Sequence, residues 1–146
     1  MRKTVSSRAK IAATPEALLA CLADYKRAGV FIEGLERLTP TGRQTKGEGA
    51  QFEAVMKVGP RTLRTTTVIA SLVPKRSITW SSTGDNGQSL SFELDPDQDE
   101  TTVSLTIEYQ EPGGIAGALI APFVEQTVQH RADTALVRLK EHCSPA

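Results

Sequence analysis

The sequence has few of the residues that usually carry metal, redox or nucleophilic chemistry. Its 146 residues include two cysteines, two histidines and one tryptophan. Neither His130 nor His142 has cysteines or carboxylates nearby at ligand spacing, so we expect no metal site. No serine or cysteine nucleophile is paired with a histidine in a recognisable pattern. We therefore assign no catalytic residue and expect no cofactor.

Charge of one sign and long apolar runs are also lacking. Seventeen basic and seventeen acidic side chains give a net charge of zero, which argues against nucleic acid as a partner because phosphate binding needs a basic surplus. No run approaches the roughly 18 apolar residues of a membrane-spanning helix, so we expect no integral membrane segment, although peripheral membrane contact is compatible with the sequence. The N-terminus has no apolar signal region, and we predict a cytoplasmic protein with one domain over residues 1–146. The oligomeric state is not predicted.

The two cysteines are far apart in the sequence. Cys21 lies in an apolar helical run and is typical of a small core residue, whereas Cys143 lies in the C-terminal tail. They can pair only if the fold brings them together. Because the protein is predicted to be cytoplasmic, we expect both thiols to be reduced.

Short alternating segments dominate the chain. Residues 4–11 alternate between apolar and polar side chains, as in a half-buried strand. Thr14-Pro15-Glu16 is a helix start, and residues 24–30 indicate a second short helix or turn. Six further strands are predicted near residues 35–43, 51–58, 61–73, 77–82, 89–94 and 102–109, with turns at Gly59-Pro60 and residues 84–87.

One long amphipathic segment, Gly113–Cys143, follows the strands. Consecutive strands with short turns form an antiparallel meander, and this helix is the only element long enough to cover its apolar face. The fold class is therefore α+β: a strand, two short helices, six strands and a long C-terminal helix, with the curved sheet wrapped around that helix. Such an arrangement often leaves a hollow between sheet and helix, where we expect the function. The glycines of Gly113-Gly114-Ile115-Ala116-Gly117 lack phosphate-loop spacing and indicate a flexible entry to the helix.

Four passages resemble a known superfamily. They are residues 13–17 with 22–24, the proline-basic turn in residues 72–80, residues 100–103, and Gly113-Gly114 followed by the helix ending in residues 136–140. With the element order, they resemble the START-like (SRPBCC) helix-grip superfamily, most closely its polyketide cyclase/dehydrase and lipid-transport branch, which includes coenzyme Q-binding proteins. The resemblance implies that a hydrophobic small molecule binds between the sheet and the C-terminal helix. One departure is the early loop 25–31, which lacks the family's proline and leaves the shape of the pocket entrance undetermined.

Alternation selects the side chains that face the helix. We predict that the ligand-binding residues are Phe52, Met56, Trp80, Phe92, Leu105, Ile107 and Tyr109 from the strands, and Ile120, Val124, Thr127 and Arg131 from the helix. Trp80 and Tyr109 are the strongest strand candidates, because their N–H and O–H groups need polar partners. The remaining strand residues are equally compatible with simple core packing.

Charged residues near this face have alternative roles. Arg131 lies on the apolar side of the helix, where it is suited to anchor a ligand carboxylate, to form a structural salt bridge, or to extend to the rim. Arg64 would be a second anchor if it pointed inward, but we expect it to face solvent. His130 is interpreted as a packing or surface residue rather than an acid–base catalyst.

Three functions are compatible with these observations. The first is binding or transport of a hydrophobic small molecule, such as a lipid, a quinone or a polyketide-like compound. The second is a cyclase- or dehydratase-like enzyme that uses Arg131, Tyr109 or His130 as polar groups. The third is a module that binds a protein or a membrane surface.

Overall fold

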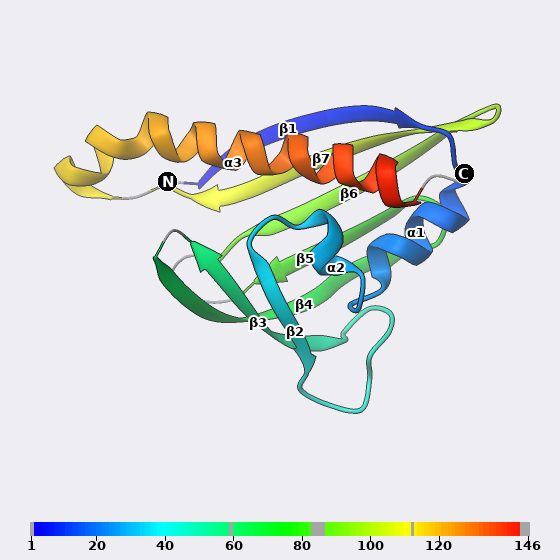
Figure 1. The fold of residues 1–146 in the computed structure, drawn as a ribbon, viewed down its shortest axis with the longest axis horizontal. Helices are drawn as coiled ribbons and strands as arrows, with labels where there is room; N and C mark the ends of the chain where they lie inside the picture. The colour runs from blue at the N-terminus through cyan, green and yellow to red at the C-terminus, as the bar shows by residue number, and fades with distance from the viewer. Residues whose placement is uncertain (1, 59, 83–86, 112, 144–146) are drawn as a thin grey trace.

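One curved antiparallel sheet organises the protein. The computed structural model describes residues 2–58, 60–82, 87–111 and 113–143. The sheet has seven strands in the order β1-β7-β6-β5-β4-β3-β2, so that β1 and β2 form its edges. The strands are β1 (Arg2–Ile11), β2 (Leu35–Pro40), β3 (Gln51–Val58), β4 (Arg61–Val73), β5 (Ser77–Ser82), β6 (Ser89–Asp97) and β7 (Glu100–Gln110). The predicted α+β helix-grip fold is confirmed (Figure 1).

The strands follow the alternation in the sequence. Val5 is paired with Ile107, and Phe92 with Leu105, so apolar side chains of neighbouring strands lie side by side on the concave face. The strand expected over residues 35–43 ends at Pro40, and Thr41 then donates its N–H to Gln51 O at 3.0 Å. Of the predicted turns, residue 59 and residues 83–86 lie outside the described residues.

Two short helices cover one end of the concave face. In α1 (Pro15–Ala23), Thr14 Oγ1 accepts a hydrogen bond from Ala17 N at 3.2 Å, which confirms the predicted N-cap. Leu18 and Leu22 of α1 are fully buried against the sheet. Phe31, in α2 (Ala28–Phe31), meets Phe92 edge to face, with 6.1 Å between ring centroids.

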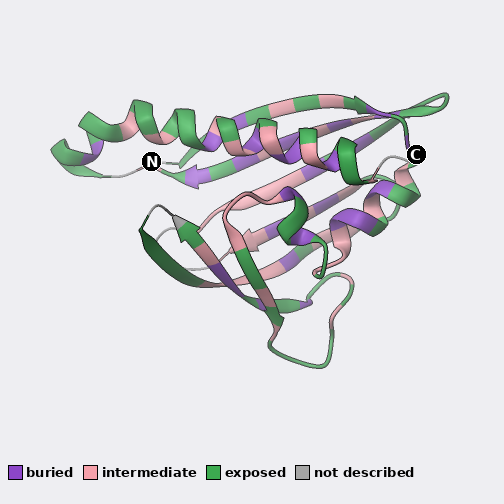
Figure 2. Ribbon diagram, viewed as in Figure 1, coloured by how far each residue is buried: buried purple, intermediate pink, exposed green. Residues whose placement is uncertain are grey.

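The long helix α3 (Gly114–Cys143) crosses the same face and packs against β1, β7 and α2. The residues that contact the core lie mostly in its second half: Val128, Ala132, Ala135, Leu136 and Leu139. Figure 2 shows the contrast, because the first turns of α3 are almost entirely exposed whereas buried positions recur along the second half. The buried residues of the three helices therefore gather where α1, α2 and the second half of α3 meet over one end of the sheet.

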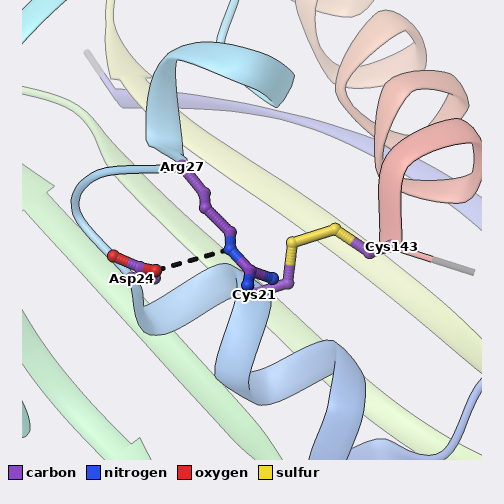
Figure 3. Close-up of a disulfide and its surroundings, with 4 residues drawn as sticks. All are labelled: Cys21, Asp24, Arg27 and Cys143. Carbon is purple, nitrogen blue, oxygen red and sulfur yellow. Dashed lines mark ion pairs between the residues drawn. A yellow bond between two sulfur atoms is a disulfide. The ribbon is translucent and has the colours of Figure 1, made fainter.

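A disulfide joins two of these helices, so the expectation of reduced cysteines is wrong. Cys21 in the last turns of α1 is bonded to Cys143 at the end of α3, with a Cα–Cα distance of 6.4 Å (Figure 3). The expectation failed because the two positions are 122 residues apart and only the packing of α3 on α1 brings them together. The bond fixes the C-terminal end of α3 to the first helix.

Reduction of this bond should destabilise the protein substantially. A disulfide that closes a loop of this length lowers the chain entropy of the unfolded state. In the simplest model this raises the free energy of unfolding by about 5 kcal/mol. We expect dithiothreitol to lower the urea midpoint of the wild type and to leave that of Cys143→Ala unchanged. Equal sensitivity of the two proteins to dithiothreitol, or free thiols in the denatured but unreduced wild type, would contradict the bond.

Candidate functional site

Six of the predicted ligand-binding residues form a closed inner group. Phe52, Trp80, Phe92, Leu105, Ile107 and Tyr109 are all less than 5% exposed. The rings of Phe52 and Trp80 lie 5.6 Å apart, and all six residues belong to the main hydrophobic core. At these positions the concave face is filled by the protein's own side chains.

The other predicted residues form an outer group near the open end of the sheet. Met56 and Val124 are partly buried, whereas Ile120 and Thr127 are exposed. Thr127 Oγ1 donates to Phe123 O at 2.9 Å, a bond within the helix. The helical face shared by Ile120, Val124, Thr127 and Arg131 lies beside the sheet-facing surface formed by Val128, Ala132, Ala135 and Leu139. The structure thus separates the predicted site into a buried inner group and a partly exposed outer group.

Arg131 is partly buried and has no hydrogen bond or ion pair with any of the described residues. A structural salt bridge within that part of the chain is therefore excluded, which leaves the roles of ligand anchor and rim residue. Arg64 instead points outward and pairs with Glu53 at 3.1 Å, as expected for a solvent-facing residue. It is not part of the concave face.

Two buried side chains at the site carry polar groups. Trp80 Nε1 donates a hydrogen bond to Leu22 O at 3.0 Å. The backbone of α1 therefore supplies the polar partner that we expected a ligand-binding cavity to supply. Burial raises the pKa of the Tyr109 phenol, and the carboxylates of Glu125 and Glu111 raise that pKa further. Tyr109 is therefore a protonated phenol at neutral pH.

His130 lies on the exposed side of α3. Its Nε2 is 3.5 Å from Glu33 Oε2 and 3.4 Å from Thr134 Oγ1. Glu33 Oε2 is buried and accepts no hydrogen bond from the described residues. The position confirms the interpretation as a surface residue, and His130 contacts the segment that follows α2.

A hollow that the alternation did not predict opens beside the inner group. It has a volume of about 300 Å³ and is lined by Tyr25, Lys26, Gly29, Leu35, Glu36, Arg37 and Leu38. The Tyr25 ring lies 5.2 Å from Phe52, and Lys26 Nζ lies 5.9 Å from the Tyr25 ring. The only sequence signal for this hollow is the early loop, which the family resemblance associates with the pocket entrance. A second, shallower hollow of about 340 Å³ surrounds Glu53 and Arg64.

The strand that borders the first hollow is held in place by a glycine. Gly34 has a φ of +87°, and a Cβ on it would lie 2.9 Å from Lys57 O. The carbonyl of Gly34 also accepts a hydrogen bond from Lys57 N at 2.8 Å. A side chain at position 34 would separate the start of β2 from β3 and change the edge of the hollow.

Metal and membrane features are not found in the described residues. No group of three or more histidine, cysteine, aspartate or glutamate side chains in that part of the chain is placed to hold a metal ion. No helix there is both long and apolar enough to cross a bilayer.

A family model described as polyketide cyclase/dehydrase and lipid transport matches residues 2–144. The chain belongs to this family. The match covers both hollows and all eleven predicted ligand-binding residues, and it confirms the superfamily predicted from the sequence. None of the curated proteins matches the chain.

Solved structures share the fold at low sequence identity. A Thermus thermophilus protein, TTHA0849, aligns with a TM-score of 0.80 and 20% identity over 95% of both chains. The Zhui aromatase/cyclase from a Streptomyces species aligns at 0.79 and 16% identity over 98% of this chain and 94% of that one. A START superfamily protein from Mycobacterium smegmatis aligns at 0.72 and 14% identity over 94% and 97%. At these identities the likeness concerns the fold alone.

The environment of Tyr109 can be measured directly, because the chain has only two tyrosines. In the Tyr25→Phe variant, the phenolate absorbance reports Tyr109 alone. We expect its midpoint above the ordinary value of about 10, since burial and two carboxylates disfavour the charged form. Glu125→Gln should move the midpoint part of the way back, and a midpoint at or below 10 in Tyr25→Phe would contradict the burial.

Proposed function

We propose that the protein binds a hydrophobic small molecule, such as a lipid, a quinone or a polyketide-like compound, between the concave face of the sheet and α3. The observation that carries this proposal is the aromatic contact series Tyr25–Phe52–Trp80, which runs from an open hollow into the core. A volume of about 300 Å³ is at the lower end of small-molecule pockets. The family description, with its lipid transport and cyclase/dehydrase members, supports the same class of ligand.

The ligand would approach the core from the hollow or from the open end under α3. Leu35 and Leu38 line the hollow, and Met56 and Val124 are partly buried apolar side chains that would border the route under α3. Each route has a cation beside it, Arg37 at the hollow and Arg131 on the helix. Arg131 is our choice for the polar anchor, because it is partly buried and has no partner among the described residues.

The first experiment compares the protein's mass under native conditions and after organic extraction. An apolar compound released at one copy per chain would support the proposal and give the ligand's chemical class. An empty protein would then be titrated with fatty acids, quinones and aromatic polyketides. Trp80 is the only tryptophan and contacts Phe52, so its fluorescence reports binding near the inner group. No extracted compound and no response to any of these probes would refute the proposal.

The anchor assignment has its own test. We expect Arg131→Gln to weaken binding of a long-chain carboxylate by about tenfold, roughly 1.4 kcal/mol, with little effect on the matching alcohol. Arg64→Gln is the control, since Arg64 points away from the concave face. If Arg37→Gln lowers carboxylate affinity and Arg131→Gln does not, the head group lies at the hollow and the assignment to Arg131 is wrong.

A cyclase- or dehydratase-like activity is the second candidate. The observation in its favour is Tyr109, a buried phenol that stays protonated at neutral pH and is available to donate to a substrate carbonyl. Turnover of an aromatic polyketide that falls at least tenfold in Tyr109→Phe, with binding unchanged, would support it. Binding without turnover would leave the carrier or sensor role alone.

A cytoplasmic location stays a proposal from the sequence. The disulfide between Cys21 and Cys143 weighs against it, because structural disulfides are rare in reducing compartments. Rapid alkylation of thiols in intact cells measures which state is present where the protein resides.

A further inference from the structure

The first half of α3 presents an apolar surface that nothing in the described part of the chain covers. Ile115 is 87% exposed, Leu119 74% and Phe123 69%. These residues are spaced four apart, so they form one straight ridge along the helix, here called the apolar ridge. Ile120, 48% exposed, lies beside it.

The apolar ridge faces away from the proposed ligand site. Gly117, Val128, Ala135 and Leu139 are buried and mark the face of α3 that packs on the rest of the molecule. By helical periodicity, Leu119 lies on the opposite face, with Ile115 and Phe123 on either side of that direction. Figure 1 shows that these first turns also extend past the end of the sheet. A ligand bound between sheet and helix would leave the ridge in water.

We propose that the apolar ridge is the contact surface of a symmetric dimer, and that its occupant is the same ridge of a second copy of this chain. The three side chains of the ridge and the neighbouring Ile120 together present roughly 500 Å² of apolar surface, near the upper limit for a typical monomer. Pairing two copies would bury about 1,000 Å² or more, which reaches the lower limit for a specific interface. A ridge of residues spaced by four packs into the grooves of an identical helix, and a two-fold axis makes the same patch serve both partners.

The charge distribution favours a second copy over a lipid surface. Residues 113–124 contain no charged side chain, and the net charge of the chain is zero, so two copies do not repel each other. An interfacial membrane helix usually carries lysine and arginine on its polar face. From Gly114 to His130, α3 has no lysine or arginine, and its one carboxylate is Glu125.

Sedimentation velocity from low to high micromolar concentration tests the dimer on the full chain. We expect the wild type to shift from one to two chains per particle, and Leu119→Glu/Phe123→Glu to remain monomeric with at least about 100-fold weaker association, because like charges would meet at the axis. Val73→Glu is the matched control, since it charges an exposed apolar residue on β4 and should dimerise like the wild type. Circular dichroism melts check that the variants stay folded.

Three results would overturn the proposal. The first is a wild type that is monomeric at every concentration. The second is a folded Leu119→Glu/Phe123→Glu variant that dimerises as the wild type does. The third is a monomeric wild type that floats with phosphatidylcholine or phosphatidylglycerol vesicles while that variant does not, which would assign the ridge to a lipid surface. None of these outcomes depends on whether a ligand binds under α3.

Discussion

A curved sheet with one apolar face must have that face removed from water, and most of the structure follows from how this is done. The concave face carries Phe52, Trp80, Phe92 and Leu105, all nearly or fully buried. Burying a side chain of this size contributes about 1.5–3 kcal/mol, so removing this face from water stabilises the fold substantially. Cover comes from α1, α2 and α3, and the three helices meet over one end of the face.

At that junction a hydrogen bond and a disulfide join elements that are far apart in the sequence. The indole of Trp80 donates to the backbone of α1 at Leu22, one residue from the disulfide at Cys21. Sheet, first helix and last helix are thereby joined within a few residues of one another. The opposite end has no comparable connection in the described residues, and there α3 leaves the sheet with its apolar side chains exposed. The two ends of α3 thus differ in how closely the helix is joined to the rest of the molecule.

The sequence predicted the elements well because period-two alternation and the cap at Thr14 are local signals. It could not predict which candidate site residues are buried and which are exposed, for physical reasons that differ by residue. In the first half of α3, apolar residues occur on every face, so periodicity alone could not tell that Ile120 is exposed while Val128 is buried. Trp80 was expected to need a ligand because its partner, a carbonyl 58 residues away, is invisible to local patterns. The hollow at Tyr25 and Leu35 combines a loop with an edge strand, and only tertiary packing brings them together.

The pairing of β1 with β7 has a consequence for how the protein is made. Arg2–Ile11 lies beside Thr101–Gln110, and β1 has no other strand neighbour. β1 therefore leaves the ribosome before its partner β7, which is the last of the seven strands, and α3 with Cys143 follows later still. At synthesis rates of about 5–20 residues per second, β1 would spend several seconds unpaired. Its polar face of Thr4, Ser6, Arg8 and Lys10 discourages association with other chains during that interval. The sheet is thus completed only after β7 has been made, when β1 is added to six strands that can already pair with one another.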